Sequence, residues 1–450
     1  MDLSVVIPAL READNLGKLL PKLHQVVSGL EISRTSTGES TAPVGSKSRH
    51  FSGEALSRIT YEIIVVDNHS PDSTAEVCAA QGAALVQQTT PGYGGALWAG
   101  FERATGEYIL TMDADLSHVP DFVPAMWKHR NEAELVIASR YVQGGVAEMP
   151  WYRYVLSIIL NVVYTKALAL PVHDISSGFR LYRASVLPGL GLSSTDFDAL
   201  EEILIKCYAM GCRIVEIPFR YVPRDEGKSK VKLLQFGMSY LRTLLRMWKL
   251  RHSIASADYD ARAYDSVIPL QRYWQRRRYA LVTDMVDNSR SCLDIGCGSS
   301  RILGALSEHT VGLDISLGKL RYSRSYHRPL INASAFALPF TDGAFEQIVC
   351  SQVIEHLPSS AQPFREIARA LKNGGHLLLG TPDYGRWNWV VIERLYRYFA
   401  PDAYGDQHIT HYDRAGLISI LEGLGFRVLQ TRYIWGAEMI LFLNKTDGKS

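Results

Sequence analysis

The sequence lacks the features that would assign it to a specialised class of protein. Its cysteines have neither zinc-site nor disulfide-framework spacing and mostly lie in apolar stretches (Cys78, Cys207, Cys212, Cys292, Cys297 and Cys350). The most apolar window, 154–172, contains Asn161, Thr165 and Lys166, so it is not a clean membrane span, although an interfacial position stays open for it. Lys and Arg total 48 against 46 Asp and Glu, and no nucleic-acid-binding motif occurs. A disulfide scaffold and a nucleic-acid-binding protein are therefore not expected.

The chain begins with a strand-like run, 3–7, rather than with a charged region followed by an apolar signal segment. Together with the cysteine pattern, this start predicts a protein of the reducing cytoplasm. The 450 residues exceed what one hydrophobic core usually supports, so we expect two domains. Apolar residues make up 47% and charged residues 21% of the chain, which is the balance of a globular protein.

Strand-like and helix-like runs alternate twice along the chain. The expected strands lie at 4–7, 63–66 and 108–112, and then at 291–295, around Val349 and at 376–380. This order predicts two α/β domains, at 1–252 and 257–445, separated by the polar segment 253–258. The stretch 31–57 is rich in Ser, Thr and Gly and offers little apolar surface, so we interpret it as a mobile insertion in the first domain.

The stretch 228–251 has the pattern of an amphipathic helix. One face carries apolar residues with cations alongside: Leu234, Met238, Leu241, Leu245 and Trp248, then Arg242, Arg246 and Lys249. On a membrane surface the apolar face would enter the acyl boundary while the cations meet anionic headgroups. The same face could instead pack on the neighbouring domain, and both interpretations stay open.

The expected strand at 108–112 ends in two carboxylates, Asp113 and Asp115. Ligands of open α/β sheets bind at the carboxyl ends of strands, and alternate acids there can hold a divalent cation through oxygen. Such a cation would neutralise the charge that develops when a glycosidic bond to a diphosphate breaks. An isolated Asp-x-Asp is more often a solvated turn, so the surrounding motifs decide its meaning.

Three motifs precede the acidic pair, at 5–12, 64–70 and 92–100. Together with the pair they resemble the family-two glycosyltransferases of the GT-A fold, above all the polyprenyl-phosphate (dolichyl-phosphate) mannosyl- and glucosyltransferases, over about 2–232. The resemblance implies an inverting enzyme that uses a GDP- or UDP-sugar and Mg²⁺ or Mn²⁺. It assigns the nucleotide to Pro8, Ala9, Glu12 and Asp67, and the metal and diphosphate to Asp113 and the catalytic Asp115.

Further matches to this family lie at 138–141, 174–180 and 224–230. The resemblance implies a polyprenyl phosphate acceptor, which basic residues would position against the donor sugar (Arg140, Arg180, Arg224 and Lys228). Because such a phosphate is already ionised near neutral pH, alignment and charge neutralisation can replace a strong general base. Two positions depart from the family pattern: Asn68 replaces a second aspartate, and Ser117 replaces a glutamine that often assists the metal.

The second half of the chain contains a strand that enters a tight glycine turn, at 292–300, with Asp294, Gly296 and Gly298. Asp314 ends the next expected strand, where a carboxylate can accept hydrogen bonds from both ribose hydroxyls. Arg301 stands where the dinucleotide motif G-x-G-x-x-G requires a third glycine. A dinucleotide cofactor is therefore not expected.

Four segments follow this turn, at 334–340, 345–350, 351–357 and 371–376. Together they resemble the class I S-adenosylmethionine-dependent methyltransferases, over about 257–445. The resemblance implies a Rossmann-like domain in which the 294–298 turn holds the methionine part of S-adenosylmethionine and Asp314 the ribose. It assigns the adenine edge to Ser334, Ala335 and Phe336, with Ser334 in place of the usual aspartate.

Methyl transfer to a hydroxyl needs a base, and the candidates are His356, His408 and His411. We take His356 as the catalytic candidate, with a packed histidine as the alternative. His408 and His411 lie in a polar stretch, where metal binding is a further alternative.

The sequence therefore predicts a bifunctional enzyme, peripheral at the cytoplasmic face of a membrane. One domain would transfer a sugar to polyprenyl phosphate, and the other would methylate a hydroxyl of a small or glycolipid-related molecule, with tethering favouring a shared pathway. One rival is an inactive glycosyltransferase-like module that brings an active methyltransferase to the membrane. The intact pair of Asp113 and Asp115 argues against it. Another rival is a methyltransferase whose glycosyl acceptor is an ordinary soluble molecule and not a lipid.

Overall fold

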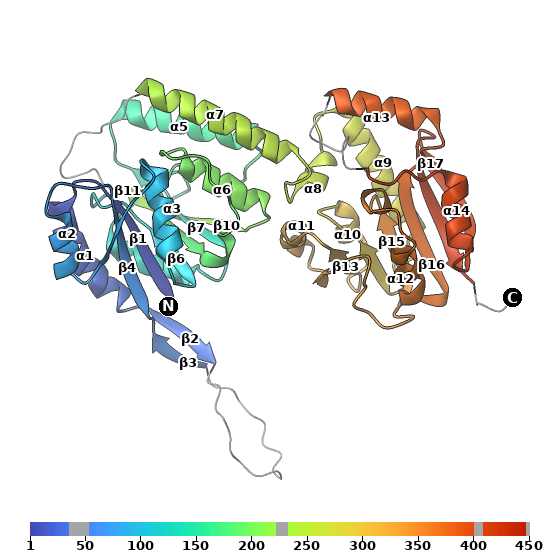
Figure 1. Cartoon of the computed structure of the whole chain (residues 1–450), viewed down its shortest axis with the longest axis horizontal. Helices are drawn as coiled ribbons and strands as arrows, with labels where there is room; N and C mark the ends of the chain where they lie inside the picture. The colour runs from blue at the N-terminus through green and yellow to red at the C-terminus, as the bar shows by residue number, and fades with distance from the viewer. Residues whose placement is uncertain (36–53, 222–232, 400–407, 447–450) are drawn as a thin grey trace, which may run out of the picture. The chain divides into compact units, whose positions relative to one another are not determined.

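The computed structural model describes residues 1–35, 54–221, 233–399 and 408–446. They form two compact units, Met1–Tyr208 with Cys212–Met247, and Ala209–Gly211 with Trp248–Ser450. Each unit has a seven-stranded sheet with helices packed on it (Figure 1). The predicted α/β class is confirmed for both units, and every predicted strand is present.

The sheet of the first unit has the strand order β10-β7-β9-β6-β1-β4-β5. Its strands in chain order are β1 (Leu3–Ala9), β4 (Tyr61–Asp67), β5 (Ala84–Gln87), β6 (Tyr108–Thr111), β7 (Leu135–Ser139), β9 (Arg180–Arg183) and β10 (Ile214–Pro218). Only β9 runs antiparallel to its neighbours in this sheet. The three parallel strands β4, β1 and β6 therefore end side by side at one edge, and Ala9 is level with Asp67.

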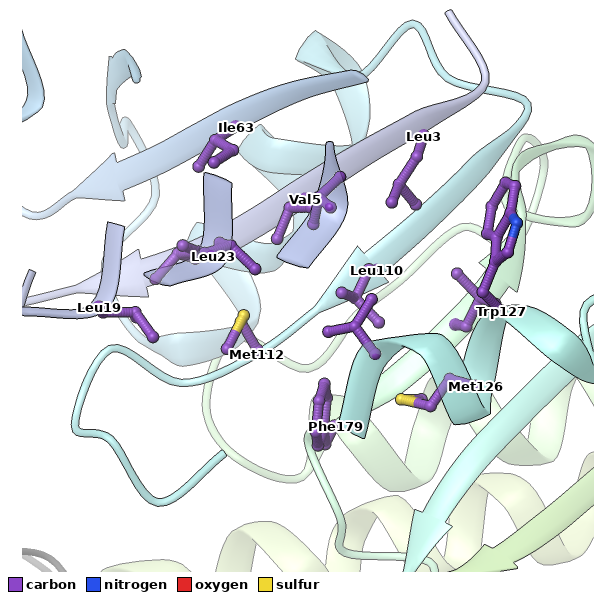
Figure 2. Packing of buried hydrophobic residues seen from close by; sticks show 14 of the residues in the cluster. Leu3, Val5, Leu19, Leu23, Ile63, Leu110, Met112, Met126, Trp127 and Phe179 are labelled. Carbon is purple, nitrogen blue, oxygen red and sulfur yellow. The ribbon is translucent and has the colours of Figure 1, made fainter. Parts of the chain in front are cut away.

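The helices of the first unit are α1 (Ala13–Val27), α2 (Thr74–Ala80), α3 (Tyr93–Arg103), α4 (Val123–Lys128), α5 (Trp151–Ala167), α6 (Ala199–Ala209) and α7 (Leu233–His252), which belongs to this unit as far as Met247. In α1 the residues Leu16, Leu19, Leu20 and Leu23 are buried, because this spacing places them on one helix face. Figure 2 shows Leu19 and Leu23 beside Val5 and Met112 in the core of the first unit.

The insertion at 31–57 was predicted to be a mobile loop over its whole length. In the structure it begins and ends in strands. β2 (Glu31–Thr35) and β3 (Glu54–Arg58) pair antiparallel. Ladder hydrogen bonds satisfy the backbone here without a large apolar surface, and Ile32 packs against the core of the first unit. Residues 36–53 lie outside the described residues.

The sheet of the second unit has the order β14-β13-β12-β15-β16-β18-β17. Its strands are β12 (Cys292–Ile295), β13 (Val311–Asp314), β14 (Leu330–Asn332), β15 (Phe345–Ser351), β16 (Leu371–Pro382), β17 (Phe426–Ile434) and β18 (Glu438–Lys445). The first five are parallel, and β18 is antiparallel to both of its neighbours. The strand order reverses between β12 and β15, which is the topological switch point where doubly wound sheets bind ligands.

The helices of the second unit are α8 (Tyr259–Ala263), α9 (Pro269–Met285), α10 (Arg301–Ala305), α11 (Leu317–Ser323), α12 (Gln362–Ala370), α13 (Trp387–Phe399) and α14 (Arg414–Glu422). The segment 253–258, predicted as a polar separator, is partly packed, with Ser256, Ala257 and Asp258 all buried. The cause is a buried ion pair, because Arg251 donates to both carboxylate oxygens of Asp258 at 2.6 and 2.8 Å. The domain limits at 252 and 257 stay predictions.

Two neighbouring helices of the first unit present apolar side chains to solvent. The α5 and α7 helices lie side by side (Figure 1), and the Tyr164 hydroxyl donates to the backbone carbonyl of Tyr240 at 2.5 Å. Exposed residues on α5 are Trp151, Tyr152, Tyr154, Val155, Leu156, Ile159, Val162 and Val163, and those on α7 are Met238, Leu241, Leu245 and Trp248. We call this surface the α5–α7 face. Among the described residues no helix is long and apolar enough to cross a membrane.

Candidate active sites

The carboxyl edge of the first sheet gathers the predicted nucleotide residues. Asp67 ends β4 and is buried, with its Oδ2 accepting hydrogen bonds from the Ser70 backbone N–H at 2.9 Å and the Gln87 amide at 3.1 Å. Its Oδ1 has no hydrogen-bond partner among the described residues. A buried polar atom left unpaired costs about 1–3 kcal/mol, so this oxygen fits an N–H donor such as that of a nucleobase.

The other predicted nucleotide residues lie at the same edge. Pro8 and Ala9 close β1, opposite Val66 and Asp67. Glu12 precedes α1 and accepts a hydrogen bond from the Asn15 amide at 2.7 Å. Pro8 and Ala9 therefore lie on the strand end beside Asp67, and Glu12 lies in the loop that follows β1.

Asp113 follows β6 and is held by two aromatic neighbours. Its Oδ1 accepts a hydrogen bond from the Tyr93 hydroxyl at 3.0 Å, and its backbone N–H donates to Nδ1 of His118 at 2.8 Å. A Cβ at Gly178 would lie 2.7 Å from the Tyr93 hydroxyl, so the absence of a side chain there leaves room for this arrangement. Burial, followed by the charge of Asp113, raises the pKa of Tyr93 well above its usual value, so the hydroxyl stays a donor at neutral pH.

Asp115 is buried and lies two residues further along the same loop. Its Oδ1 accepts hydrogen bonds from the backbone N–H and the hydroxyl of Ser117, at 3.1 and 2.5 Å. Ser117, which departs from the family pattern, therefore orients the carboxylate instead of reaching toward a metal with an amide. Two carboxylates fixed by hydrogen bonds at a strand end suit a hard divalent cation, which prefers oxygen ligands.

The second unit contains the glycine turn at the end of β12. Gly296 has φ +65° and Gly298 has φ +54°, in the left-handed region that favours glycine. A Cβ at Gly296 would lie 2.3 Å from Cγ2 of Val353, and one at Gly298 would lie 2.7 Å from Oδ2 of Asp260. The turn therefore accepts no side chain at either position, as a backbone cradle for a ligand requires.

Two buried acids flank this turn. Burial, helped by the charge of Asp314, raises the pKa of Asp294 to about 8, and its Oδ2 has no partner among the described residues. Asp314 ends β13 and accepts hydrogen bonds from the backbone N–H groups of Gly298 at 2.8 Å and Ser316 at 2.7 Å. The unpaired Oδ2 of Asp294 at the glycine turn fits a cationic nucleoside, the predicted S-adenosylmethionine.

The predicted adenine residues are arranged by a local turn. The Ser334 hydroxyl accepts a hydrogen bond from the Phe336 backbone N–H at 3.2 Å, and Ala335 packs against the core of the second unit. Ser334 thus stabilises the loop after β14, and its contact with adenine stays a prediction.

The candidate base His356 has a second histidine beside it. The rings of His356 and His408 lie 5.0 Å apart, although 52 positions separate the residues in the sequence. Burial, followed by the charges of His356 and His411, lowers the pKa of His408 to about 4. Burial raises the pKa of the adjacent Glu355 to about 8. His411 instead stacks on Tyr384, with ring centroids 4.0 Å apart.

Comparison with known proteins finds a matching protein family for each half of the chain. A family model described as "Glycosyl transferase family 2" matches residues 54–191, and one described as "Methyltransferase domain" matches 293–379. An undecaprenyl-phosphate mannosyltransferase from Micrococcus luteus is 34% identical over 189 residues, covering 38% of this chain and 75% of that protein. The chain belongs to glycosyltransferase family 2. Its second domain is a methyltransferase domain, and the predicted fold classes and enzyme types are confirmed.

A dolichol-phosphate mannosyltransferase from Pyrococcus furiosus is 32% identical over 260 residues, covering 55% of this chain. The match spans 64% of the length of that relative. Among solved structures, glucosyl-3-phosphoglycerate synthase from Mycobacterium tuberculosis, in complex with Mn²⁺, UDP and glucosyl-3-phosphoglycerate, is 20% identical, covering 55% of this chain and 79% of that chain, with a TM-score of 0.39. A TM-score this low supports no conclusion about chemistry.

The basic residues of the glycosyltransferase domain differ in their surroundings. The Arg140 guanidinium donates two hydrogen bonds to Asp174, at 2.8 and 2.7 Å, and a third to the Ser176 hydroxyl at 2.8 Å. Although burial acts the other way, Arg140 holds the pKa of Asp174 below its usual value. Arg224 and Lys228 lie outside the described residues. An acceptor contact stays a prediction for all three.

Arg180 is fully buried in the glycosyltransferase domain. It donates hydrogen bonds to three backbone carbonyls, those of Ser177 at 2.7 Å, Leu200 at 2.7 Å and Ile175 at 2.5 Å. These hydrogen bonds join the loop after α5 to α6. Direct contact with an acceptor phosphate would require these bonds to rearrange, and it stays a prediction.

Sequence reasoning missed three residues of these sites. Tyr93 and His118 hold Asp113 in the glycosyltransferase domain, and Asp260 of α8 lies on the glycine turn of the methyltransferase domain. Lys319 donates to Asp260 at 3.0 Å, and the Ser299 backbone N–H also donates to it at 3.3 Å. Tyr93 lies inside the glycine-rich motif at 92–100, which is its only signal in the sequence. Nothing in the local sequence of Asp260 marks a contact made 38 residues away at Gly298.

Proposed function

We propose that the chain is a bifunctional enzyme that works at a membrane surface. The glycosyltransferase domain transfers a sugar, with inversion, from a GDP- or UDP-sugar to a polyprenyl phosphate. The methyltransferase domain transfers a methyl group from S-adenosylmethionine to a hydroxyl of a small or glycolipid-related molecule. The observation that carries the first part is the fixed pair Asp113 and Asp115 beside the unpaired Oδ1 of Asp67.

In the sugar transfer, Asp67, Pro8, Ala9 and Glu12 would bind the nucleoside. A Mg²⁺ or Mn²⁺ ion held by Asp113 and Asp115 would neutralise the diphosphate as it leaves. The acceptor oxygen attacks the anomeric carbon while the carbon–oxygen bond to the diphosphate breaks. Because a phosphate acceptor is already ionised, the protein needs to supply alignment rather than a strong base.

Relatives support a lipid phosphate as the acceptor. The names of the two relatives describe transfer to dolichol phosphate and undecaprenyl phosphate, both polyprenyl phosphates. The α5–α7 face gives such a lipid a surface to approach, since aromatic and aliphatic side chains lie exposed on two adjacent helices. Of the cations predicted beside the α7 face, Arg242 and Lys249 are exposed, while Arg246 turns toward Glu202 at 3.5 Å.

In the methyltransferase domain, the glycine turn with Asp294 and Asp314 would hold S-adenosylmethionine. His356, which follows β15, would accept the proton of the hydroxyl as the methyl group moves from sulfur to oxygen. Only the position of His356 supports this role. His356 ends the short turn that follows Val353, whose side chain lies against Gly296.

A transfer assay tests this proposal. Purified chain is given GDP- and UDP-sugars, a polyprenyl phosphate and Mn²⁺, and Asp115→Ala is compared with Asp121→Asn, which alters an exposed acid paired with Lys22. We expect Asp115→Ala to lose at least about 100-fold in rate and Asp121→Asn to lose nothing. Binding of S-adenosylmethionine, measured by calorimetry, should be the same in both variants.

Wild-type protein that transfers no sugar to polyprenyl phosphate, but still binds S-adenosylmethionine, would support the inactive-module rival instead. Transfer that survives Asp115→Ala would contradict the role of the acidic pair.

A further inference from the structure

Three groups that can bind a transition metal meet in the methyltransferase domain. One carboxylate oxygen of Glu355 and one ring nitrogen each of His356 and His408 all lie within 4.8 Å of one another. The backbone fixes this meeting, because the N–H groups of Ile409 and Thr410 donate to the carbonyl of Glu355 at 2.8 and 3.0 Å. The histidines are thus brought together by hydrogen bonds between two distant segments.

Glu355 supplies an independent reason to expect a cation. Its side chain is fully buried, and Oε2 accepts a hydrogen bond from the Thr381 hydroxyl at 3.1 Å. Oε1 has no hydrogen-bond partner among the described residues. A buried carboxylate oxygen without a partner is costly, and a bound cation removes that cost.

A second layer of residues orients His408. Its Nδ1 is 2.7 Å from the Tyr384 hydroxyl, which donates in turn to Glu393 at 3.2 Å. If Nε2 of His408 bound a metal, Nδ1 would carry the hydrogen and donate it to the Tyr384 hydroxyl. Both hydrogen bonds, from His408 to Tyr384 and from Tyr384 to Glu393, would then be kept. Metal-binding histidines usually have such a partner on the second nitrogen, which fixes tautomer and ring orientation.

We propose that Glu355, His356 and His408 bind a divalent ion of the zinc class, with an open position for an oxygen of the methyl acceptor. Two imidazoles with one carboxylate form a donor set that suits Zn²⁺ in sites that keep an open position. To bind the ion, the three ligand atoms, which lie within 4.8 Å of one another, would move to about 2.0–2.2 Å from it.

The acceptor part of this inference rests on the proposed methyl transfer. A hydroxyl oxygen bound to the ion loses its proton to water and forms the new bond to the methyl carbon. The carbon–sulfur bond breaks with its electrons on sulfur, and S-adenosylhomocysteine leaves. His356 then acts as a ligand rather than as the proton acceptor, and the acceptor class is a hydroxyl compound that can coordinate a metal.

Cobalt(II) is the probe, because its visible absorption reports nitrogen ligation and distinguishes this site from the all-oxygen pair of the glycosyltransferase domain. The full chain carries Asp113→Asn and Asp115→Asn, so that this pair no longer competes. We expect one equivalent of Co²⁺ to bind with the absorption of a nitrogen-ligated ion. His408→Ala and Glu355→Gln should each weaken binding at least about tenfold.

His411→Ala is the matched control, because His411 lies three residues from His408 and stacks on Tyr384 but is not among the three ligands. It should bind Co²⁺ like the parent. Glu355→Gln guards against misfolding, since its amide oxygen can still accept the hydrogen bond from Thr381, and circular dichroism checks each variant.

A parent chain without nitrogen-ligated Co²⁺, or a His411→Ala variant that loses it as fully as His408→Ala, would overturn the metal site. Calorimetry with S-adenosylmethionine separates this failure from that of the proposed function. Cofactor binding without Co²⁺ binding removes only the metal site, whereas Co²⁺ binding without cofactor binding removes the proposed methyl transfer.

Discussion

The hydroxyl of Tyr93 donates a 3.0 Å hydrogen bond to Oδ1 of Asp113, across 20 positions of sequence. Tyr93 is the first residue of α3, and Asp113 follows β6. The bond therefore joins the glycine motif of the glycosyltransferase domain to its acidic pair. It identifies Tyr93 as a positioning residue for the proposed metal.

Tyr93→Phe should weaken metal-dependent nucleotide binding about fivefold, because one hydrogen bond to a partly exposed carboxylate contributes roughly 1 kcal/mol. Calorimetry with GDP or UDP and Mn²⁺ measures the effect. Tyr152→Phe removes a hydroxyl on the exposed side of α5 and should change nothing. Equal losses in both variants would show that the Tyr93 bond does not orient Asp113.

Gly296→Ala should reduce the affinity for S-adenosylmethionine at least about tenfold. The new Cβ would lie 2.3 Å from Cγ2 of Val353, so the turn would have to shift. Gly374→Ala is a matched control, since Gly374 also has a positive φ, +73°, but nothing lies within 4 Å of its Cβ position. Both variants carry a similar backbone strain of about 1 kcal/mol. Only Gly296→Ala should lose cofactor binding in a calorimetric titration.

Glu201 and Glu202 are adjacent on α6, but their pKa values shift in opposite directions, so their substitutions should have different effects. Burial raises the pKa of Glu201 to about 8, and neither of its carboxylate oxygens has a partner among the described residues. Glu201 is therefore protonated when folded and ionised when unfolded between the two pKa values. Its contribution to stability is largest below pH 4.5 and falls as the pH rises toward 8.

Glu201→Gln should flatten the pH dependence of the melting temperature of the glycosyltransferase domain between about pH 5 and pH 8. Glu202→Gln should lower the melting temperature throughout this range, because Glu202 loses Lys206 at 2.6 Å and the Ser194 backbone N–H at 2.7 Å. Calorimetric melting curves measure both. An unchanged slope in Glu201→Gln would mean that Glu201 is ionised in the folded protein.

Asp258→Asn should destabilise the chain by about 3–5 kcal/mol, because it leaves the buried Arg251 without its counter-charge. Asp265→Asn alters exposed ion pairs with Arg276 and Arg301 and should cost less than about 1 kcal/mol. Urea unfolding of both variants gives the comparison. Similar costs would show that the Arg251–Asp258 pair is not a structural anchor.

Leu245→Glu on α7 should weaken binding to anionic liposomes about tenfold, since it removes the burial of one leucine from the α5–α7 face. Leu429→Glu changes an equally exposed leucine on β17 of the methyltransferase domain and should leave flotation unchanged. Absence of flotation in the wild-type chain would favour a soluble acceptor.

The sequence predicted the strands and the sheet-edge acids because both depend on local patterns. A buried strand followed by Asp113 and Asp115, or by Gly296, signals the edge of a sheet within a few residues. The helix α7 was also predicted, and four of the residues on its predicted apolar face are exposed, Met238, Leu241, Leu245 and Trp248.

Contacts between distant segments could not be predicted in this way. The burial of Arg180 depends on carbonyls from α6 and from the loop after α5, and the meeting of His356 with His408 depends on backbone bonds from Ile409 and Thr410 to Glu355. Arg180 could be identified as basic, but its partners follow only from the packing of α6 on β9. Side-chain roles that depend on such packing need the folded structure.

Calorimetry of nucleoside diphosphate binding tests the central claim most directly. GDP and UDP are titrated into the full chain with Mn²⁺ and again with a chelator, for the wild type and for Asp115→Ala. We predict that Mn²⁺ strengthens binding of one of the two nucleotides at least about tenfold in the wild type and not in Asp115→Ala. Binding that is absent, or equally strong without the metal, would contradict the assignment of Asp113 and Asp115.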